Sequence, residues 1–405
     1  MDTYEVDVCV VGGGPGGMTL ALLLARSGIR VAVVERSRTF ERDYRGEILQ
    51  PGAMTLLDEL GILGPARARG GYPLGRFQLI EHGRVLMNID YAQLPKPFDF
   101  LLSIPQRHIL EELLAACEKE ATFTYLPGRS VSTLLTEGKR VTGVTAGSGE
   151  NQVTVRASWV VAADGRYSKV RRLAGIEFDR MDVFEHDVLW FKIRQPGRSS
   201  HDVRVVRANG NPVLIFDSYP ERVQIGWTLP HGRYREIAQQ GFDAVKRQIL
   251  PAVPEYADAI EEQITGIGDL SLLDVFGGYA REWVRDGLVL IGDCAHTHAP
   301  IGAQGINLAI QDAVIVHPML VRAVRAGLTS ASALEEYPRV RRPDIDRVMT
   351  LQIRQAKAML SSSGRLGTAI RPVVAKLLAY TPLYAKILQQ IAYGRPVRVA
   401  TEYFQ

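Results

Sequence analysis

The 405-residue chain contains only three cysteines: Cys9, Cys117 and Cys294. An odd number of widely separated cysteines gives no disulfide framework, and no pair has the close spacing of zinc or iron–sulfur ligands. The sequence therefore predicts no metal site and favours a reducing compartment, the cytoplasm.

Long apolar runs and strong charge are also lacking. No apolar run reaches the length of a membrane-spanning helix, and the N-terminal residues do not resemble a secretory signal. The formal net charge is +4, which is too small to indicate nucleic-acid binding. With 46% hydrophobic and 23% charged residues, the composition is that of an ordinary globular protein long enough for two domains. These features favour a protein that acts on a small molecule, without nucleic acid.

The clearest pattern lies in residues 1–35. An apolar run leads into a glycine-rich loop, an alanine- and leucine-rich segment follows, and a second apolar run ends in Glu35. This order predicts strand, tight turn, helix and strand, the βαβ unit of nucleotide-binding folds. A carboxylate at the end of the second strand can accept hydrogen bonds from a ribose and disfavours a 2′-phosphate. The site is therefore expected to take FAD or NAD.

Gly12, Gly14 and Gly17 supply the G-x-G-x-x-G spacing of this unit. Gly12 permits a sharp turn out of the strand, Gly14 lets a pyrophosphate approach the backbone, and Gly17 lets the helix lie close to the sheet. The pyrophosphate would then meet free N–H groups at the positive end of the helix.

Two later apolar strands also end in acidic residues. Residues 159–163 precede Asp164, and residues 288–291 precede Asp293. A loop rich in proline and glycine follows the second of these strands and opens a helix that we expect over 304–327.

The texture between these strands is different, because apolar and polar residues alternate and turn signals recur. We therefore expect an α/β fold in which a β-rich domain is inserted twice into a nucleotide-binding domain, followed by a helical region. The expected boundaries are 1–71, 101–182 and 277–336 for the nucleotide-binding domain, 72–100 and 183–276 for the β-rich domain, and 337–405 for C-terminal helices.

Three motifs in this order resemble those of the FAD-dependent aromatic hydroxylases, the class A flavoprotein monooxygenases related to para-hydroxybenzoate hydroxylase. The motifs are GGGPGG from residue 12, ADGRYSKVR from residue 163 and GDCAHTHAPIGAQGINLAIQDA from residue 292. The resemblance implies a Rossmann-like FAD-binding domain, a β-rich substrate domain, FAD as cofactor, and NADH or NADPH as electron donor.

The resemblance also implies a reaction. NAD(P)H would reduce the flavin, O2 would form a flavin C4a-hydroperoxide, and this species would hydroxylate an aromatic, quinone-like or polyketide-type small molecule. No acid–base triad is needed, so no side chain is singled out as catalytic. A second glycine fingerprint for the nicotinamide is lacking from the sequence, which fits this group of enzymes.

Carried over residue by residue, the resemblance implies a FAD site in two halves. Asp164 belongs to a motif that serves both FAD and the nicotinamide donor, and Asp293 would bind the ribityl chain. The residues expected around the adenosine and pyrophosphate are Gly12, Gly14, Gly17, Glu35 and Arg36, with Arg45 and Arg107 as further FAD contacts.

The other half is the loop that would face the flavin ring. Its N–H groups, at the start of a helix, would lie near N1 and O2 and stabilise negative charge on the reduced flavin. We call it the flavin-facing loop, and its expected contact residues are Pro300, Gly302, Gly305, Ile306 and Asn307.

Several polar residues that could carry chemistry are instead expected to be structural. Cys294 stands where the family usually has alanine, and a small buried thiol packs much like alanine. Two histidines two residues apart are poor evidence for a metal or an acid–base pair. These two are His296 and His298. Other residues, Asp217, Tyr219 and His231, could deprotonate a phenol, but a structural role is favoured for each of them.

The C-terminal region is basic, with arginines and lysines among apolar residues from Arg347 to Arg398. Such a helix can lie on an anionic membrane as a peripheral contact. We favour the alternatives, which are packing on the acidic remainder of the chain or a homodimer contact.

Two alternatives to the monooxygenase hypothesis stay open. One is a FAD-dependent reductase of isoprenoid double bonds on the same scaffold. The other is a non-catalytic flavin-binding protein. A halogenase is disfavoured, because the sequence lacks its W-x-W-x-I-P pattern.

Overall fold

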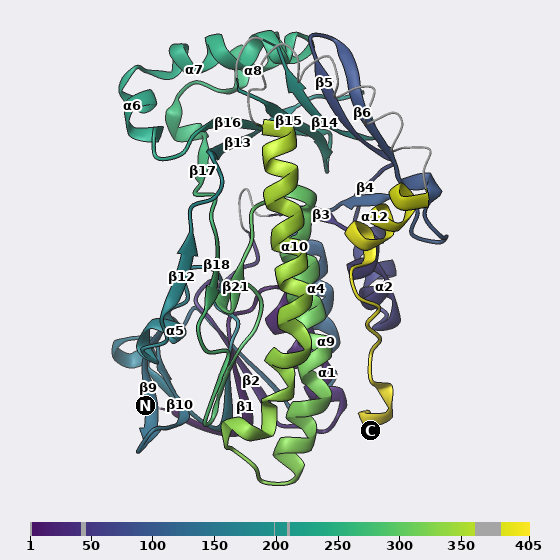
Figure 1. Ribbon diagram of the computed structural model, residues 1–405. Helices are drawn as coiled ribbons and strands as arrows, with labels where there is room; N and C mark the ends of the chain where they lie inside the picture. Colours follow the sequence, from purple (N-terminus) through teal and green to yellow (C-terminus); the bar gives the residue numbers. More distant parts are fainter. Residues whose placement is uncertain (1, 42–45, 198, 209–210, 361–381) are drawn as a thin grey trace.

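The structure is a computed structural model that describes residues 2–41, 46–197, 199–208, 211–360 and 382–405. Figure 1 shows two β-sheet regions, one below the other, with the long helix α10 (Glu336–Leu360) running alongside both. The expected α/β class is confirmed: a Rossmann-like region with a second, β-rich region inserted into it.

The lower region is built on an eight-stranded sheet in the order β19-β20-β11-β1-β2-β8, with β10 and β9 added beside β11. Neighbouring strands from β20 to β8 run parallel, so their carboxyl ends lie at one edge of the sheet. The strands are β1 (Asp2–Val11), β2 (Val31–Glu35), β8 (Phe123–Pro127), β9 (Val131–Glu137), β10 (Arg140–Ala146), β11 (Val153–Ala162), β19 (Val284–Arg285) and β20 (Leu288–Leu290).

Helix α1 (Pro15–Arg26) is buried almost throughout, because alanine and leucine cover all its sides. It packs between α4 (Gln106–Cys117) and α9 (Gln304–Arg325). A Cβ atom on Gly17 would lie 2.0 Å from the carbonyl oxygen of Gly12, so only glycine lets the helix come this close. Helix α9 begins where the sequence predicts and ends two residues earlier.

The upper region is a seven-stranded sheet in the order β17-β13-β16-β15-β14-β5-β6. Its β5–β6 hairpin comes from the first β-rich segment and pairs through β5 with β14 of the second. The two β-rich segments therefore form one sheet, as expected, while the exact domain boundaries stay a prediction. The strands are β5 (Arg76–Glu81), β6 (Arg84–Asp90), β13 (His186–Arg194), β14 (Asp202–Arg207), β15 (Val213–Ser218), β16 (Arg222–Pro230) and β17 (Ser271–Leu273).

This upper sheet has two buried faces. One packs against α6 (Tyr234–Gln239), α7 (Phe242–Ile249) and α8 (Ala257–Gln263). The other, which we call the inner face, packs with α10, α12 (Pro382–Tyr393) and Ala299 of the chain entering the flavin-facing loop. Figure 1 shows α6 to α8 at the top, away from the lower sheet.

Short elements join the two regions. Two three-stranded sheets, β12-β18-β21 and β3-β7-β4, lie between them, and small helices flank the lower sheet. These elements are β3 (Ile48–Leu49), β4 (Tyr72–Leu74), β7 (Leu101–Ser103), β12 (Phe178–Met181), β18 (Gly277–Ala280), β21 (His296–Thr297), α2 (Pro51–Glu59), α3 (Leu63–Ala68) and α5 (Lys169–Leu173).

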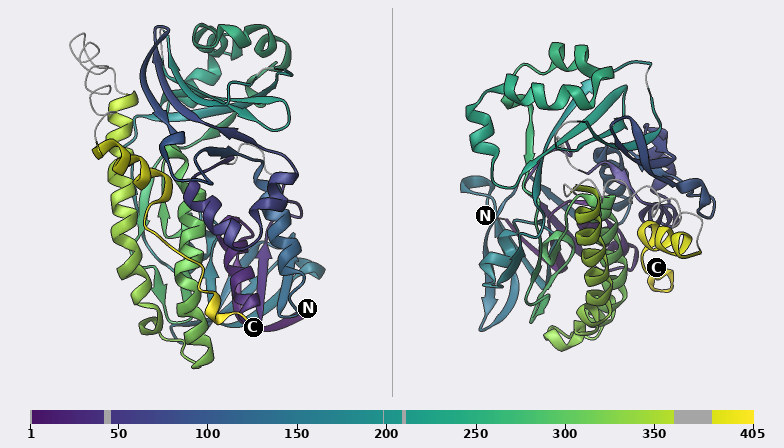
Figure 2. Two further views of the ribbon diagram at one scale, coloured as in Figure 1. Left: turned by 90° about the vertical axis from the view of Figure 1, so that its right-hand side faces the viewer. Right: turned by 45° about the horizontal axis from the view of Figure 1, so that its top comes forward.

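The expectation of helices to the end of the chain is wrong for residues 394–400. Gly394 adopts a left-handed φ of 64°, which ends α12. The chain then runs extended down the lower region, as Figure 1 and the left view of Figure 2 show. The backbone N–H of Gln405 donates to the carbonyl of Arg26 at 2.8 Å. The terminus thus packs on the nucleotide-binding region.

Within the described residues, no helix is long and apolar enough to cross a membrane. The basic tail is only partly described, since residues 361–381 lie outside the described ranges. Of the described basic residues, Arg395 donates to the carbonyl of Val340 at 3.3 Å and lies 3.8 Å from Asp344.

Candidate functional site

The parallel strands of the lower sheet bring the predicted residues together. Strands β1, β2, β11 and β20 end at one edge, so the glycine loop, Glu35, Asp164 and Asp293 all follow strand ends on that side. Ligands of open α/β sheets bind at this edge. Gly12 and Asp293, about 280 residues apart in sequence, thus contribute to one site.

The glycine loop presents backbone donors at the start of α1. Gly12 has a φ of +112°, and a Cβ there would lie 2.3 Å from the carbonyl oxygen of Ala163. Gly14 is the N-cap residue, and no side chain in the described ranges caps this helix. The first N–H groups of α1 are therefore available to an anion, as a pyrophosphate requires.

Glu35 is buried beside this loop. Its Oε2 accepts from the N–H of Gly13 at 2.6 Å, and its Oε1 accepts from the N–H of Ser37 at 2.8 Å. The carboxylate therefore fixes the glycine loop against the end of β2, which places it where a ribose contact is expected.

Two of the three predicted arginines, Arg36 and Arg107, lie in the described part of the chain. Arg36 is exposed directly after β2. Arg107 lies in the first turn of α4 with its side chain 48% exposed, and its Nη1 is 3.6 Å from Oε1 of Glu41. Arg45 lies outside the described residues. Their contacts with FAD stay predictions.

Asp164 lies beside the start of the short helix α5, whose N-cap residue is Ser168. Its carboxylate accepts from the Ser168 hydroxyl at 2.5 Å and from the Lys169 N–H at 2.7 Å. The thiol of Cys294 donates to the same carboxylate at 3.1 Å and accepts from the N–H of Gly165 at 3.1 Å. Burial and the neighbouring Asp164 raise the pKa of the Cys294 thiol. The thiol therefore stays protonated and joins the second motif to the third.

Asp293 faces the start of α9. Its Oδ2 lies 3.5 Å from Nε of Arg166. A Cβ on Gly305 would lie 3.9 Å from Oδ1 of Asp293, so glycine keeps the space beside this carboxylate open. The predicted ribityl-binding acid and the predicted flavin-facing loop are therefore neighbours.

The flavin-facing loop is tightly bent. Gly302 and Ala303 have φ values of 73° and 51°, in the left-handed region. No described side chain caps the start of α9, so the N–H groups of Gly305 and Ile306 point out of the first turn without an intrahelical partner. The helix dipole makes this end attractive to negative charge. The side chain of Asn307 instead accepts from the N–H of Ala53 at 3.1 Å and ties α9 to α2.

Two glutamines that sequence reasoning missed hold this loop. Gln352 of α10 donates to the carbonyls of Ala299 at 3.0 Å and Ile301 at 2.7 Å. Gln50 donates to the carbonyl of Gly302 at 2.7 Å. Neither lies in a motif, and their distance from the loop in sequence left no signal by which they could be found.

A buried ion pair lies behind the loop. Asp312 of α9 accepts from Nε of Arg341 at 2.6 Å, from Nε2 of His296 at 2.7 Å and from the N–H of Gly292 at 2.7 Å. Burial alone would raise the pKa of Asp312, but His296 and Arg341 lower it by more than burial raises it. The sequence did carry a signal here, because Asp312 is the one acidic residue of α9.

The two histidines of the third motif are buried. His296 contacts Asp312, and Nδ1 of His298 lies 3.2 Å from Oε1 of Gln352. Burial, with His296 beside it, lowers the pKa of His298 to about 3. These contacts agree with the structural role expected for both residues.

The candidate phenol-deprotonating residues have structural contacts of their own. Asp217 accepts from the Ser199 hydroxyl at 2.7 Å and the His201 N–H at 2.8 Å. The ring of Tyr219 packs against those of Tyr72 and His108, with centroids 5.7 and 5.9 Å away.

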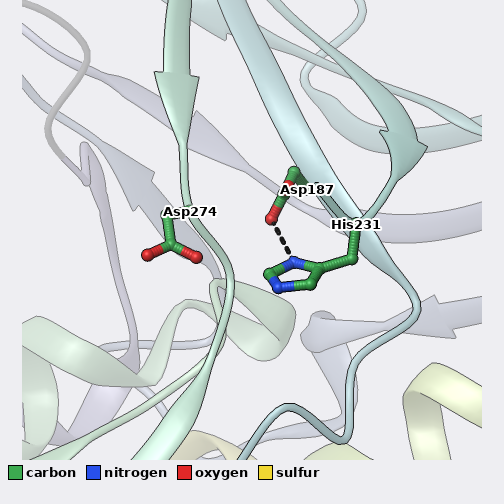
Figure 3. Close-up of side chains that lie close together, drawn as sticks. All are labelled: Asp187, His231 and Asp274. Carbon is green, nitrogen blue, oxygen red and sulfur yellow. Dashed lines mark hydrogen bonds and ion pairs between the residues drawn. The ribbon is translucent and has the colours of Figure 1, made fainter. Parts of the chain in front are cut away.

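His231 belongs to a cluster with Asp187 and Asp274 whose ligand atoms lie within 4.8 Å of one another (Figure 3). Nδ1 of His231 is 2.8 Å from Oδ1 of Asp187. Arg180 donates to both carboxylate oxygens of Asp274, at 2.9 and 2.8 Å, and Tyr167 donates to Oδ2. Arg180 therefore already balances the charge of Asp274. The prediction of no metal site stays a prediction.

Comparison with known proteins decides the family. Residues 5–352 match the family described as FAD binding domain. The chain belongs to this family. Its members bind FAD, and the glycine loop with the two uncapped helix starts fits that cofactor.

The chain is 52% identical to 6-methylpretetramide 4-monooxygenase of Streptomyces rimosus. The alignment covers 100% of this chain and 96% of that protein. The chain is 29% identical to protoasukamycin 4-monooxygenase of Streptomyces nodosus subsp. asukaensis, over 86% of this chain and 87% of that one. The solved structure of p-nitrophenol 4-monooxygenase PnpA from Pseudomonas putida DLL-E4 shares the fold. Its TM-score is 0.81 at 21% identity, over 98% of this chain and 100% of that chain.

These relatives confirm the predicted aromatic-hydroxylase family. The chain is an FAD-dependent monooxygenase that acts on a small molecule. Neither of the relatives' names supports the reductase alternative.

Proposed function

We propose that this protein hydroxylates a ring carbon of a polycyclic aromatic polyketide, with NADH or NADPH as electron donor and O2 as oxygen source. The observation that carries the proposal is the 52% identity to 6-methylpretetramide 4-monooxygenase, which extends over the whole chain. A substrate of that type is planar, rich in electrons and carries several hydroxyl groups, which suits electrophilic oxygen transfer.

We place the adenosine and pyrophosphate of FAD at Gly12, Gly14, Gly17, Glu35 and Arg36, and the ribityl chain at Asp293. Bound FAD would supply electron transfer from NAD(P)H and the activation of O2. The chain supplies the rest. The N–H groups at the start of α9 would stabilise negative charge, and Gln352 and Gln50 would fix the loop that presents them.

Location and assembly belong to the same proposal. We expect the enzyme to work in the cytoplasm on a diffusible substrate. The contacts of Arg395 with Val340 and Asp344 support packing of the basic tail on the protein itself over a peripheral membrane contact. A homodimer contact through this tail stays a prediction.

A turnover assay tests the function. The purified chain, loaded with FAD, is mixed with NADH or NADPH and with 6-methylpretetramide, a tricyclic hydroxyanthraquinone or a simple phenol. We expect 6-methylpretetramide to accelerate NAD(P)H oxidation. With isotopically heavy O2, the product should carry one labelled oxygen atom.

Other results would redirect the proposal. A product reduced by two hydrogens without label would indicate the reductase. FAD that is never reduced by either nicotinamide, with or without these compounds, would indicate the non-catalytic flavin-binding protein. Labelling of the simple phenol alone would overturn the polyketide substrate class.

A further inference from the structure

The inner face of the upper sheet carries polar groups that the FAD site does not use. Along β13, Leu189 and Phe191 pack with α7 and α8, while Trp190 packs with Ala299 at the flavin-facing loop. Because side chains alternate along a strand, Lys192 lies on the same face as Trp190. A lysine at an inward position of the apolar strand LWFKI is costly unless its charge is paired.

Lys192 has a polar neighbour on the next strand. Strand pairing sets Lys192 opposite Gln224 and Gln224 opposite Phe216, which gives a row across β13, β16 and β15. Gln224 is only 3% exposed. Among the described residues, no group bonds to its Oε1 atom. Buried side-chain amides are normally satisfied, so this acceptor is suited to a ligand.

The row also adjoins the FAD site. Glu47 forms an ion pair with Lys192, and its Oε2 accepts from the Ser218 hydroxyl at 2.7 Å. The preceding residue, Gly46, approaches the start of α9, since a Cβ there would lie 3.4 Å from Cδ1 of Ile306. The charged pair thus joins the sheet to the segment that touches the flavin-facing loop.

An aromatic wall stands beside these polar groups. The rings of Trp190 and Phe216 lie 6.0 Å apart at an interplanar angle of 69°. A Cβ on Gly226 would lie 2.5 Å from Cζ3 of Trp190, so the indole rests on bare backbone. Rings beside a cation and an amide suit a planar aromatic molecule with polar groups along one edge.

We propose that Lys192 and Gln224 bind two neighbouring hydroxyl groups of the aromatic substrate. One is held at Lys192 as an oxyanion whose proton has been released to solvent, and the other donates to Oε1 of Gln224. This assignment rests on the proposed function. It specifies that the enzyme accepts aromatic substrates with two neighbouring hydroxyl groups. Holding a ring hydroxyl as its anion makes the ring more electron-rich and directs oxygen transfer to a position conjugated with that hydroxyl. Glu47 and Ser218 act as positioning residues, because they hold Lys192 through the ion pair.

A ligand titration tests this arrangement without turnover. The FAD-loaded oxidised protein is titrated with alizarin, a hydroxyanthraquinone with adjacent hydroxyls whose visible spectrum changes on ionisation. We expect the wild-type protein to lower the apparent pKa of the bound ligand by about one unit, equivalent to about tenfold tighter binding of the anion. The analogue with a single hydroxyl, 2-hydroxyanthraquinone, should bind about tenfold more weakly, because it leaves Gln224 unpaired.

The variants separate the two roles. Lys192→Arg should keep the spectral shift. The double variant Glu47→Gln with Lys192→Met should abolish it without leaving a buried charge unpaired, which guards against misfolding. Gln224→Leu should weaken alizarin binding about tenfold and remove the preference over the single-hydroxyl analogue. Lys246→Met, on the opposite face of the sheet, and Gln78→Leu, whose side chain bonds to Asn88, are matched controls expected to behave as wild type.

The outcomes distinguish this inference from the function on which it rests. The inference alone fails if the wild type hydroxylates a polycyclic substrate, but the double variant keeps the spectral shift and Gln224→Leu keeps the preference for alizarin over the single-hydroxyl analogue. If the wild type neither binds alizarin nor hydroxylates any polycyclic compound, both fail. Loss of the shift in the double variant, with FAD content and melting temperature near those of wild type, establishes the proposed role of Lys192.

Discussion

The two large sheets position their functional atoms by different means. At the edge of the lower sheet, the groups that would meet FAD are mostly backbone atoms: N–H groups at the starts of α1 and α9 and bare glycine positions. On the inner face of the upper sheet they are side chains, above all Lys192 and Gln224. Backbone geometry depends little on neighbouring side chains, whereas a site built from side chains changes with each substitution on the sheet.

This difference explains which features the sequence could predict. The unit from β1 to β2, Asp164 and Asp293 all stand at strand ends, where glycine spacing and an acid mark the position directly. The inner face became visible only with the strand register that sets Lys192 opposite Gln224 and Phe216. Alternation in a strand shows which residues share a face, but it does not show what lies across from them.

The same limit applies to the supports of the cofactor site. Gln352 and Gln50 reach the flavin-facing loop from positions far away in the chain, and Arg341 meets Asp312 from another helix. Contacts of this kind depend on how helices pack, which periodicity cannot supply. The non-helical end of the chain was missed for a related reason, since its path is set by contacts with Arg26 and other distant residues.

The largest effect is expected where the backbone site depends on a buried side chain. Arg341→Leu leaves Asp312 charged and buried without its main partner, which should cost about 3–5 kcal/mol of folding free energy. Urea unfolding of the FAD-loaded protein measures it, with Arg339→Leu, an exposed position of the same helix, as control. If the cofactor end truly needed only backbone geometry, the two variants would be equally stable.

A smaller effect is expected from the glycine loop itself. In Gly17→Ala the new methyl would lie 2.0 Å from the carbonyl oxygen of Gly12, forcing α1 away from the sheet. We expect Gly17→Ala to lose about 1–3 kcal/mol of stability. We also expect the variant to lose its FAD during gel filtration. Thermal melting and the flavin absorbance of the purified protein report both. Gly64→Ala is the control, because a Cβ there meets no described atom within 4 Å.

The next effect concerns activity more than stability. Gln352→Leu leaves the carbonyls of Ala299 and Ile301 without their donor, so the loop should lose its fixed position. We expect FAD to stay bound while the rate of hydroxylation falls about tenfold, equivalent to about 1.4 kcal/mol. Hydrogen peroxide released per NAD(P)H consumed should rise. An unchanged product yield, like that of the exposed control Gln389→Leu, would mean that the loop is held by other contacts.

The smallest effect is a dependence of stability on pH that arises in the lower region. His317 of α9 lies against Ser27, with Nε2 2.8 Å from the hydroxyl, and against the rings of Tyr403 and Phe404. Burial lowers the pKa of His317 to about 4. The unfolded chain takes up a proton near pH 6.5 whereas the folded chain does not. The stabilisation is therefore complete above about pH 6.5 and is lost as the pH falls from there toward 4.

Between pH 7 and 5.5 this residue should account for about 1 kcal/mol of lost stability. His317→Gln keeps a hydrogen-bonding side chain but does not titrate, so its stability should fall less over this interval than that of the wild type. His82→Asn, in the exposed β5–β6 turn, is the control and should follow the wild type. Urea unfolding at both pH values measures the difference. Parallel curves for wild type and His317→Gln would show that acid destabilises the protein at other groups and not at the contact of His317 with the C-terminal residues.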